Sequence, residues 1–248
     1  MTMSVISFLI FLGGANAVMI GTGYAAGRHR STGRCILILF LLVVAVWQTY
    51  HGLMISGLLV RYPHFGLVHV PFLYATGPLL YFFSKFLTRD EYSLKPCDAL
   101  HFIPSLVIAA LLAPFYMKGA EEKRRFLVDQ IGIRAHDAFT TAYSIMILLI
   151  ILAIIVYIVK FWKHSMIVFR SRHLKLNQIT YFSMIIVAIN FLVVIIYIAG
   201  FILYHAFSLD HAVYEKTIIF ISLITTLMVY LVFLMGMRYS DYFSLVMQ

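Results

Sequence analysis

The sequence predicts an all-α integral membrane protein: a bundle of seven transmembrane helices with the amino terminus outside and the carboxyl terminus in the cytoplasm. Hydrophobic residues make up 62% of the 248 residues and charged residues only 12%, whereas about a quarter of the residues in soluble domains are charged. The mean hydropathy is +0.95. Seven apolar runs, and an uneven distribution of Lys and Arg between them, predict the number of helices and their orientation.

Each of the seven apolar runs is long enough to cross a hydrocarbon layer of about 30 Å as a helix. They lie at about residues 4–25, 35–60, 64–87, 99–117, 138–162, 179–204 and 217–237. The first run does not resemble a cleaved signal peptide, because no Lys or Arg precedes it and the basic residues Arg28, Arg30 and Arg34 follow it. The connections leave no room for a soluble domain, so we expect residues 1–248 to form a single transmembrane domain.

Positive charge distinguishes the two sides of the predicted bundle. The connections on one side carry 12 Lys and Arg with a net charge of +8, and those on the other side carry seven with a net charge of +1. Because cytoplasmic connections are enriched in Lys and Arg, the first side is predicted to be cytoplasmic. The same bias explains the overall charge of +9 without a nucleic-acid partner. The connection from Lys118 to Asp137 is the exception, since it is predicted to be external and yet carries five basic residues.

The two cysteines, Cys35 and Cys97, both fall at helix ends that are predicted to be cytoplasmic. Disulfides are rare in that reducing compartment, so we expect both thiols to be free. Two cysteines and ten histidines show no metal-ligand spacing, so we expect no metal site.

The third run departs most from a uniform apolar helix, because it contains Pro71 and the pair Gly77 and Pro78. Proline lacks a backbone N–H, and glycine is a poor helix former. Such a helix is tolerated at membrane depth where neighbouring helices surround it. We therefore expect this run to be the central helix, interrupted at these three residues, which act as a hinge between two packed arrangements. The alternative is that they only shape a rigid bundle.

Several polar side chains fall inside the apolar runs, where they are costly and mark candidate functional sites. If the runs cross the membrane in alternating directions, these residues lie at similar depths in the middle and outer parts of the bundle. We predict that they converge on one pocket that binds a small or lipid-like ligand. The candidate ligand-binding residues are Gln48, His51, His69, Tyr74, Asn190 and Thr225, the last of which is followed by Thr226.

Catalytic groups are scarce in the predicted spans, which contain no Asp or Glu, and the last span has no Lys in its middle. This removes the carboxylate pairs of most membrane hydrolases and the attachment point of a retinal Schiff base. We expect neither enzymatic activity nor a cofactor; haem between His51 and either His69 or His205 is disfavoured, because outer-end histidines are commonly satisfied by their surroundings. The alternatives are a membrane enzyme or carrier for a hydrophobic small molecule and a non-catalytic assembly subunit.

Small residues recur at every fourth position of the first run, at Gly13, Ala17, Gly21 and Ala25. Such a ridge lets a neighbouring helix approach closely. We expect this ridge to pack within the chain, and a homodimer through the ridge is the alternative.

Four sequence motifs resemble those of a known protein family. They are YPHF at 62–65, PFLYATGPLLYFFSKFLT at 71–88, LHFIPSL at 100–106 and APFY at 113–116. In this order they resemble the membrane-embedded amino-terminal half of bacterial AraC-type transcription regulators, in which seven helices precede a cytoplasmic helix-turn-helix DNA-binding region. The resemblance implies a sensor in the bacterial inner membrane that binds a small or lipid-like ligand and passes a helix rearrangement to a cytoplasmic output.

The chain departs from the family pattern at its carboxyl end. Only Met237 to Gln248 follow Gly236, and this segment is too short for a helix-turn-helix unit. We therefore expect no direct nucleic-acid binding by the chain as given. The expected partners are the lipid bilayer, an unidentified ligand and an output attached at the cytoplasmic end.

Overall fold

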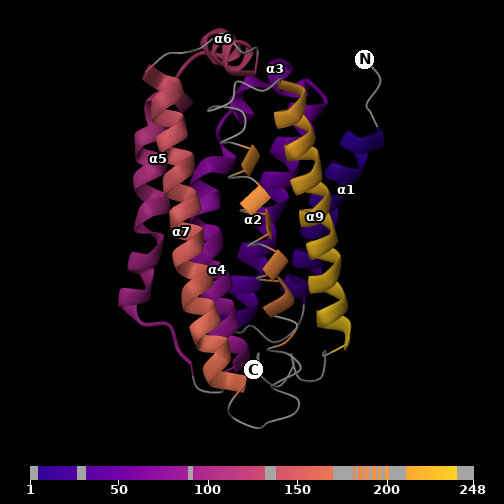
Figure 1. Ribbon diagram of the computed structural model, residues 1–248, viewed down its shortest axis with the longest axis vertical. Coiled ribbons are helices and arrows are strands. Elements are labelled where there is room, and N and C mark those ends of the chain that lie inside the picture. Colours follow the sequence, from indigo (N-terminus) through magenta and orange to yellow (C-terminus); the bar gives the residue numbers. More distant parts are fainter. Residues whose placement is uncertain are drawn as a thin grey trace.

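The computed structural model describes residues 5–26, 32–88, 92–131, 138–169 and 211–238, together with positions 181, 184–186, 188–189, 192–193, 195–196 and 199–200. Within these residues every regular element is a helix, and the long helices stand side by side (Figure 1). The elements are α1 (Val5–Ala26), α2 (Thr32–Ile55), α3 (Leu58–Arg61), η1 (Pro63–Phe65), α4 (His69–Thr88), η2 (Pro96–Phe102), α5 (Ile103–Tyr116), α6 (Ala120–Ile131), α7 (Ala138–Phe169) and α9 (His211–Arg238).

Five helical segments in the described part of the chain are long and apolar enough to cross a membrane. They are Val5–Ala26, Thr32–Ile55, Pro63–Phe86, Pro96–Tyr116 and Lys216–Leu234. The prediction of an all-helical chain is confirmed for the described residues, and five of the predicted runs are covered by helices that are long and apolar enough to cross a membrane. α7 covers the predicted fifth run as one helix, and the described positions within 179–204 are helical, but membrane crossing by these two runs stays a prediction.

Pairs of neighbouring residues establish the directions of the helices. α1 runs antiparallel to α2, because Gly13 lies beside Gln48 and Gly21 beside Leu41. α1 runs parallel to α9, because Gly13 also lies beside a residue of α9 and Asn16 Nδ2 donates to the Tyr230 hydroxyl further along both helices. The start of α1 and the end of α9 therefore lie at opposite ends of the bundle, as an odd number of crossings requires. Which end faces the cytoplasm stays a prediction.

The main hydrophobic core lies between α1, α2, α4 and α9. Phe40 of α2 and Phe82 of α4 are fully buried at its centre, and Val229 of α9 closes it. By contrast, Leu106 and Leu111 of α5 are 68% and 65% exposed. Apolar side chains on the outer face of a helix are expected where the surrounding solvent is lipid.

α4 begins later than the sequence predicts and has no break at Pro71. The third run was expected to start at His64, but Pro63–Phe65 form the short helix η1, and Leu67 adopts a φ of 59° immediately before the first turn of α4 at His69. Pro71 therefore lies in the first turn, where a backbone N–H has no partner to lose. Its carbonyl accepts a hydrogen bond of 2.6 Å from Ser105 Oγ of α5. The predicted interruption at this proline is wrong.

The Gly77–Pro78 pair lies inside α4, which continues as a helix through both residues. Gly77 lies against the ring of Tyr157 on α7, and a Cβ atom at Gly77 would be 2.6 Å from Tyr157 Cδ2. The absence of a side chain thus allows α4 and α7 to approach closely. Whether the pair also acts as a hinge stays a prediction.

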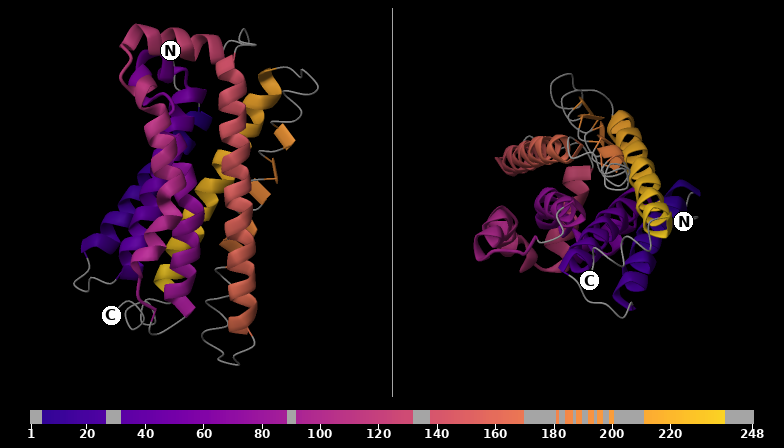
Figure 2. Two further views of the ribbon diagram at one scale, coloured as in Figure 1. Left: turned by 90° about the vertical axis from the view of Figure 1, so that its left-hand side faces the viewer. Right: turned by 90° about the horizontal axis from the view of Figure 1, so that it is seen from below.

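α6 lies crosswise over one end of the bundle (Figures 1 and 2). Its apolar face, which includes Leu127, packs on α3 and η1, and Leu127 is buried with Leu53 and Leu59. The connection from Lys118 to Asp137, which was predicted to be external, therefore contains a helix that packs on α3 and η1 at this end of the bundle.

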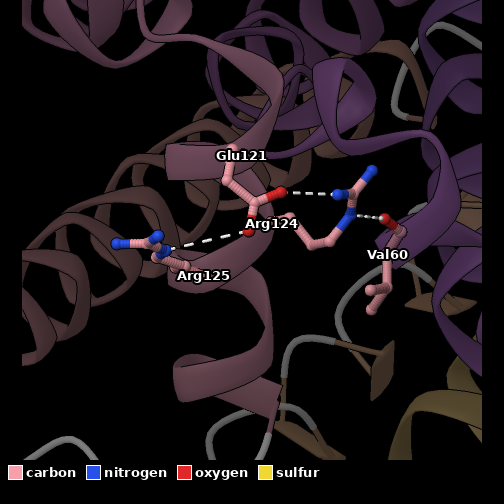
Figure 3. Close-up of polar contacts among 4 residues, drawn as sticks. All are labelled: Val60, Glu121, Arg124 and Arg125. Carbon is pink, nitrogen blue, oxygen red and sulfur yellow. Dashed lines mark hydrogen bonds and ion pairs between the residues drawn. The ribbon is translucent and has the colours of Figure 1, made fainter.

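Two basic residues of α6 contact the carbonyl groups at the ends of other helices. Lys123 is 3% exposed, and its Nζ donates to Tyr116 O at 2.7 Å and lies 3.0 Å from His64 Nδ1. Arg124 donates from Nε to Val60 O at 3.2 Å and pairs with Glu121 at 2.6 Å (Figure 3). Carbonyl groups at helix carboxyl ends carry partial negative charge and attract cations. Lys123 and Arg124, two of the five basic residues in the Lys118–Asp137 connection, therefore have a structural role.

The small-residue ridge of α1 packs within the chain. Gly13, Ala17 and Gly21 are buried, the two glycines against α2, whereas Ala25 is exposed. The expectation of packing within the chain is confirmed for these three residues. A homodimer stays a prediction.

Candidate ligand-binding site

Three of the predicted ligand-binding residues lie together where α2, α4 and α9 meet. Gln48 and His51 are three residues apart on α2 and share one face of that helix. His69, the first residue of α4, has its ring centroid 6.4 Å from that of His51. All three side chains are at least 96% buried. We call Gln48, His51 and His69 the polar cluster.

His51 is held in a neutral form by its two hydrogen-bond partners. Trp47 Nε1 donates to His51 Nε2 at 2.7 Å, and His51 Nδ1 lies 2.8 Å from Ser222 Oγ on α9. Because an indole N–H can only donate, Nε2 must accept, and the ring proton of the neutral histidine is on Nδ1. That proton is donated to Ser222 Oγ, whose own hydroxyl donates to Ile218 O at 2.8 Å. Both ring nitrogens are therefore used.

Gln48 connects α2 to α9 with its amide group. Gln48 Nε2 donates to Ser222 O at 2.8 Å and to Thr226 Oγ1 at 2.7 Å. The side chain is completely buried, and its Oε1 has no hydrogen-bond partner among the described residues. Gly13 of α1 lies against this contact, because a Cβ atom there would overlap Thr226 Oγ1 and lie 3.1 Å from Gln48 Nε2.

His69 is held by stacking, and one of its nitrogens has no partner. Its ring lies on the Tyr50 ring with a centroid distance of 3.6 Å and an interplanar angle of 25°. His69 is 4% exposed, and within the described part of the chain no group hydrogen-bonds to Nδ1. A buried polar atom without a partner costs about 1–3 kcal/mol. The polar cluster thus contains two such atoms, His69 Nδ1 and Gln48 Oε1.

The other predicted ligand-binding residues lie elsewhere. Tyr74 is buried in a hydrophobic cluster with Val70 and Ile108, which Trp47 also contacts. Thr225 is buried and donates to Ile221 O of its own helix at 2.9 Å. Asn190 lies outside the described residues.

Sequence reasoning missed Trp47 and Ser222 as members of the site. Ser222 and Thr226 are four residues apart, and residues at that separation share one face of a helix. This spacing could have identified Ser222 as a member of the site. Trp47 and His51 have the same spacing. Thr225 is also buried, but its hydroxyl donates to Ile221 O of α9 and not to a residue of α2.

His51 has hydrogen-bond partners at both ring nitrogens, whereas His69 Nδ1 has none among the described residues. His51 must lose a hydrogen bond before either ring nitrogen can take part in proton transfer or bind a haem iron. His205, the other haem candidate, lies outside the described residues. Within the described residues no group of three His, Cys, Asp or Glu could hold a metal ion. Cys35 and Cys97 are both exposed and unpaired.

Comparisons with known proteins do not assign the chain to a family. No match was found among protein-family models, curated proteins or solved structures. The resemblance to AraC-type regulators therefore rests on the four motifs alone, two of which, at 62–65 and 71–88, form η1 and α4 beside the polar cluster.

Proposed function

We propose that the chain is a membrane-embedded sensor module in which a small or lipid-like ligand binds beside Gln48 and His69 and changes the packing of α9 on α2. The observation that carries the proposal is the pair of buried atoms, Gln48 Oε1 and His69 Nδ1, that have no partner among the described residues. A ligand that hydrogen-bonds to them offsets the cost of their burial. The chemistry that fits Gln48 Oε1 is a hydroxyl or amide N–H on a largely apolar molecule.

The contacts of Gln48 support a route from the ligand to α9. Its Nε2 donates to Ser222 O and Thr226 Oγ1 of α9, so a ligand bound by Oε1 acts on the same side chain that holds α9. His51 adds a second link through Ser222 Oγ. A ligand shifts a conformational equilibrium only by making different contacts in the two states. In this proposal the two states differ in how α9 packs on α2.

The resemblance to AraC-type regulators supplies the output in this proposal. α9 ends at Arg238, at the end of the bundle that is predicted to be cytoplasmic. A DNA-binding region attached there would receive a movement of α9 directly. The location that this implies is the bacterial inner membrane, and nucleic-acid binding is assigned to the attached region and not to this chain.

Native mass spectrometry of the purified protein tests ligand binding. We expect the wild-type protein to retain a small-molecule adduct that Gln48→Leu and His69→Phe both lose; the phenylalanine preserves the stacking on Tyr50 and removes Nδ1. Thr225→Val is the matched control, because the Thr225 hydroxyl bonds only to its own helix. An adduct that persists in both site variants, or no adduct on the wild-type protein, contradicts the proposal.

Spin-label distance measurements separate a sensor from a carrier or enzyme that uses the same site. Labels at Lys95→Cys and Leu234→Cys, both exposed positions, report the distance between the start of η2 and α9 after Cys35 and Cys97 are replaced by Ser. The probe is the organic extract of the purified wild-type protein, added to delipidated protein. We expect the distance distribution to shift, whereas binding without a shift would favour a carrier or enzyme.

A further inference from the structure

A second cluster of charged and aromatic side chains lies at the opposite end of α4 from the polar cluster. Lys85 Nζ of α4 is 4.4 Å from the ring centroid of Tyr81 and 4.8 Å from that of Tyr92. Lys160 Nζ of α7 is 5.4 Å from the ring centroid of Tyr157 and 5.9 Å from that of Tyr81. One ring, that of Tyr81, is therefore within cation–π distance of two ammonium groups from different helices. We call Lys85 and Lys160 the lysine pair.

Neither ammonium of the lysine pair forms an ion pair with a carboxylate among the described residues, and Asp98 lies close enough to Lys85 for the two charges to interact. The nearby acid, Asp98 of η2, accepts hydrogen bonds from the Tyr92 hydroxyl at 2.8 Å and from the Lys95 backbone N–H at 2.9 Å. Two like charges that share one aromatic ring repel each other. An anion placed between them would be attracted by both.

The lysine pair lies toward the end of α4 at Thr88, where lipid headgroups are expected if α4 crosses a bilayer. Lys85 lies in the last turn of α4, which ends at Thr88, and it is half-buried, whereas Lys160 is exposed. Lysine at the end of a membrane helix extends its ammonium group to the bilayer interface, and tyrosine is enriched at the same level. The ring of Tyr157 contacts the rings of Tyr81 and His101. His101 Nδ1 also lies 2.6 Å from the Tyr157 hydroxyl.

We propose that the lysine pair binds the phosphate group of an anionic phospholipid, which sits on the surface between α4 and α7. A single lysine at a helix end places its ammonium group among the lipid headgroups without selecting one lipid. Two lysines from separate helices, 4.4 Å and 5.9 Å from the centroid of the Tyr81 ring, supply two ammonium groups for one phosphate. The site is distinct from the polar cluster and does not depend on the proposed sensor function.

Competitive lipid binding by the purified full chain tests this site. Native mass spectrometry measures the retention of phosphatidylglycerol against phosphatidylcholine, with inorganic phosphate added in a separate arm. We expect the wild-type protein to prefer phosphatidylglycerol and Lys85→Gln or Lys160→Gln to weaken its retention about fivefold each, as expected for one basic residue near an anionic surface. Lys160→Arg keeps the charge and is expected to keep the binding.

Lys118→Gln is the matched control, because Lys118 is an exposed lysine in the α5–α6 connection at the opposite end of the bundle and its replacement removes the same charge. Equal retention of the two lipids, or an equal loss in Lys118→Gln and Lys160→Gln, overturns the proposal. Displacement of phosphatidylglycerol by millimolar inorganic phosphate would overturn the lipid as occupant and assign the site to free phosphate. We expect Gln48→Leu to lose the adduct at the polar cluster and to retain phosphatidylglycerol like the wild-type protein. The lipid site and the sensor proposal can therefore be refuted independently of each other.

Discussion

Gly13 is the residue at which α1, α2 and α9 meet most closely. Any Cβ atom there would overlap Thr226 Oγ1 and crowd Gln48 Nε2, so the hydrogen bond between these two side chains depends on the glycine. We expect Gly13→Ala to lower stability by about 1–3 kcal/mol, the usual cost of adding atoms to a packed interior. Thermal unfolding in detergent measures the effect.

Gly23→Ala on the same helix is the control for this substitution, because nothing lies within 4 Å of a Cβ atom at that position. Alanine stabilises a helix more than glycine does, so the control is expected to be neutral or slightly stabilising. Equal melting temperatures for the two variants would contradict the close packing at Gly13.

Ser222 of α9 accepts the hydrogen bond from His51 Nδ1. Ser222→Ala removes the acceptor of the Nδ1 proton and leaves that buried N–H without a partner, which costs about 1–3 kcal/mol. We expect a larger loss of stability than in Thr225→Val, since Thr225 bonds only to Ile221 O. Chemical unfolding of both variants measures the difference, and a smaller loss for Ser222→Ala would refute the role of this contact.

Among the elements, α6 is attached to the bundle by the buried side chains of Lys123 and Leu127 and by the hydrogen bond from Arg124 to Val60 O, and Lys123 makes the most buried polar contacts. The ammonium group of Lys123 donates one hydrogen bond to Tyr116 O and directs another at His64 Nδ1. The ion pairs of Glu121 with Arg124 and Arg125 are exposed, so each contributes only about 0–1 kcal/mol to stability. We expect Lys123→Met to release α6, with faster amide hydrogen exchange across Ala120–Ile131. Lys118→Met, at an exposed position, should leave the exchange unchanged.

α4 illustrates how much of an element can be predicted from sequence. Apolar composition predicted the helix, but the effect of Pro71 depends on where the helix starts. The turn at Leu67, with its positive φ, and η1 move that start to His69, so the proline lies in the first turn. The role of Gly77 depends on Tyr157, a residue 80 positions away that the local sequence cannot place.

At the scale of the whole molecule, orientation is the prediction that most needs a direct measurement. Cys97 and Gly119 are exposed and lie in η2 and the α5–α6 connection, at opposite ends of the bundle. With Cys35 replaced by Ser, we expect a membrane-impermeant maleimide to label Cys97 only after cells are lysed. In a cysteine-free background, Gly119→Cys should be labelled in intact cells, and the reverse pattern would invert the topology.

Apolar runs of this length satisfy their backbone hydrogen bonds in lipid only as helices, so composition and run length were enough to predict a helical chain whose helices can cross a membrane. The sequence also placed Gln48 and His51 on one face of α2, since their spacing of three residues is a local property. That Ser222 and Thr226, and not Thr225, hydrogen-bond to this pair follows from how α9 packs on α2. The rotation of α9 about its axis is set by packing against α1 and α2, where Gly13 leaves room for Thr226. This packing brings Gln48 into contact with Ser222 and Thr226, which are 174 and 178 positions away in the sequence. The residue pattern of a single helix cannot predict such a contact.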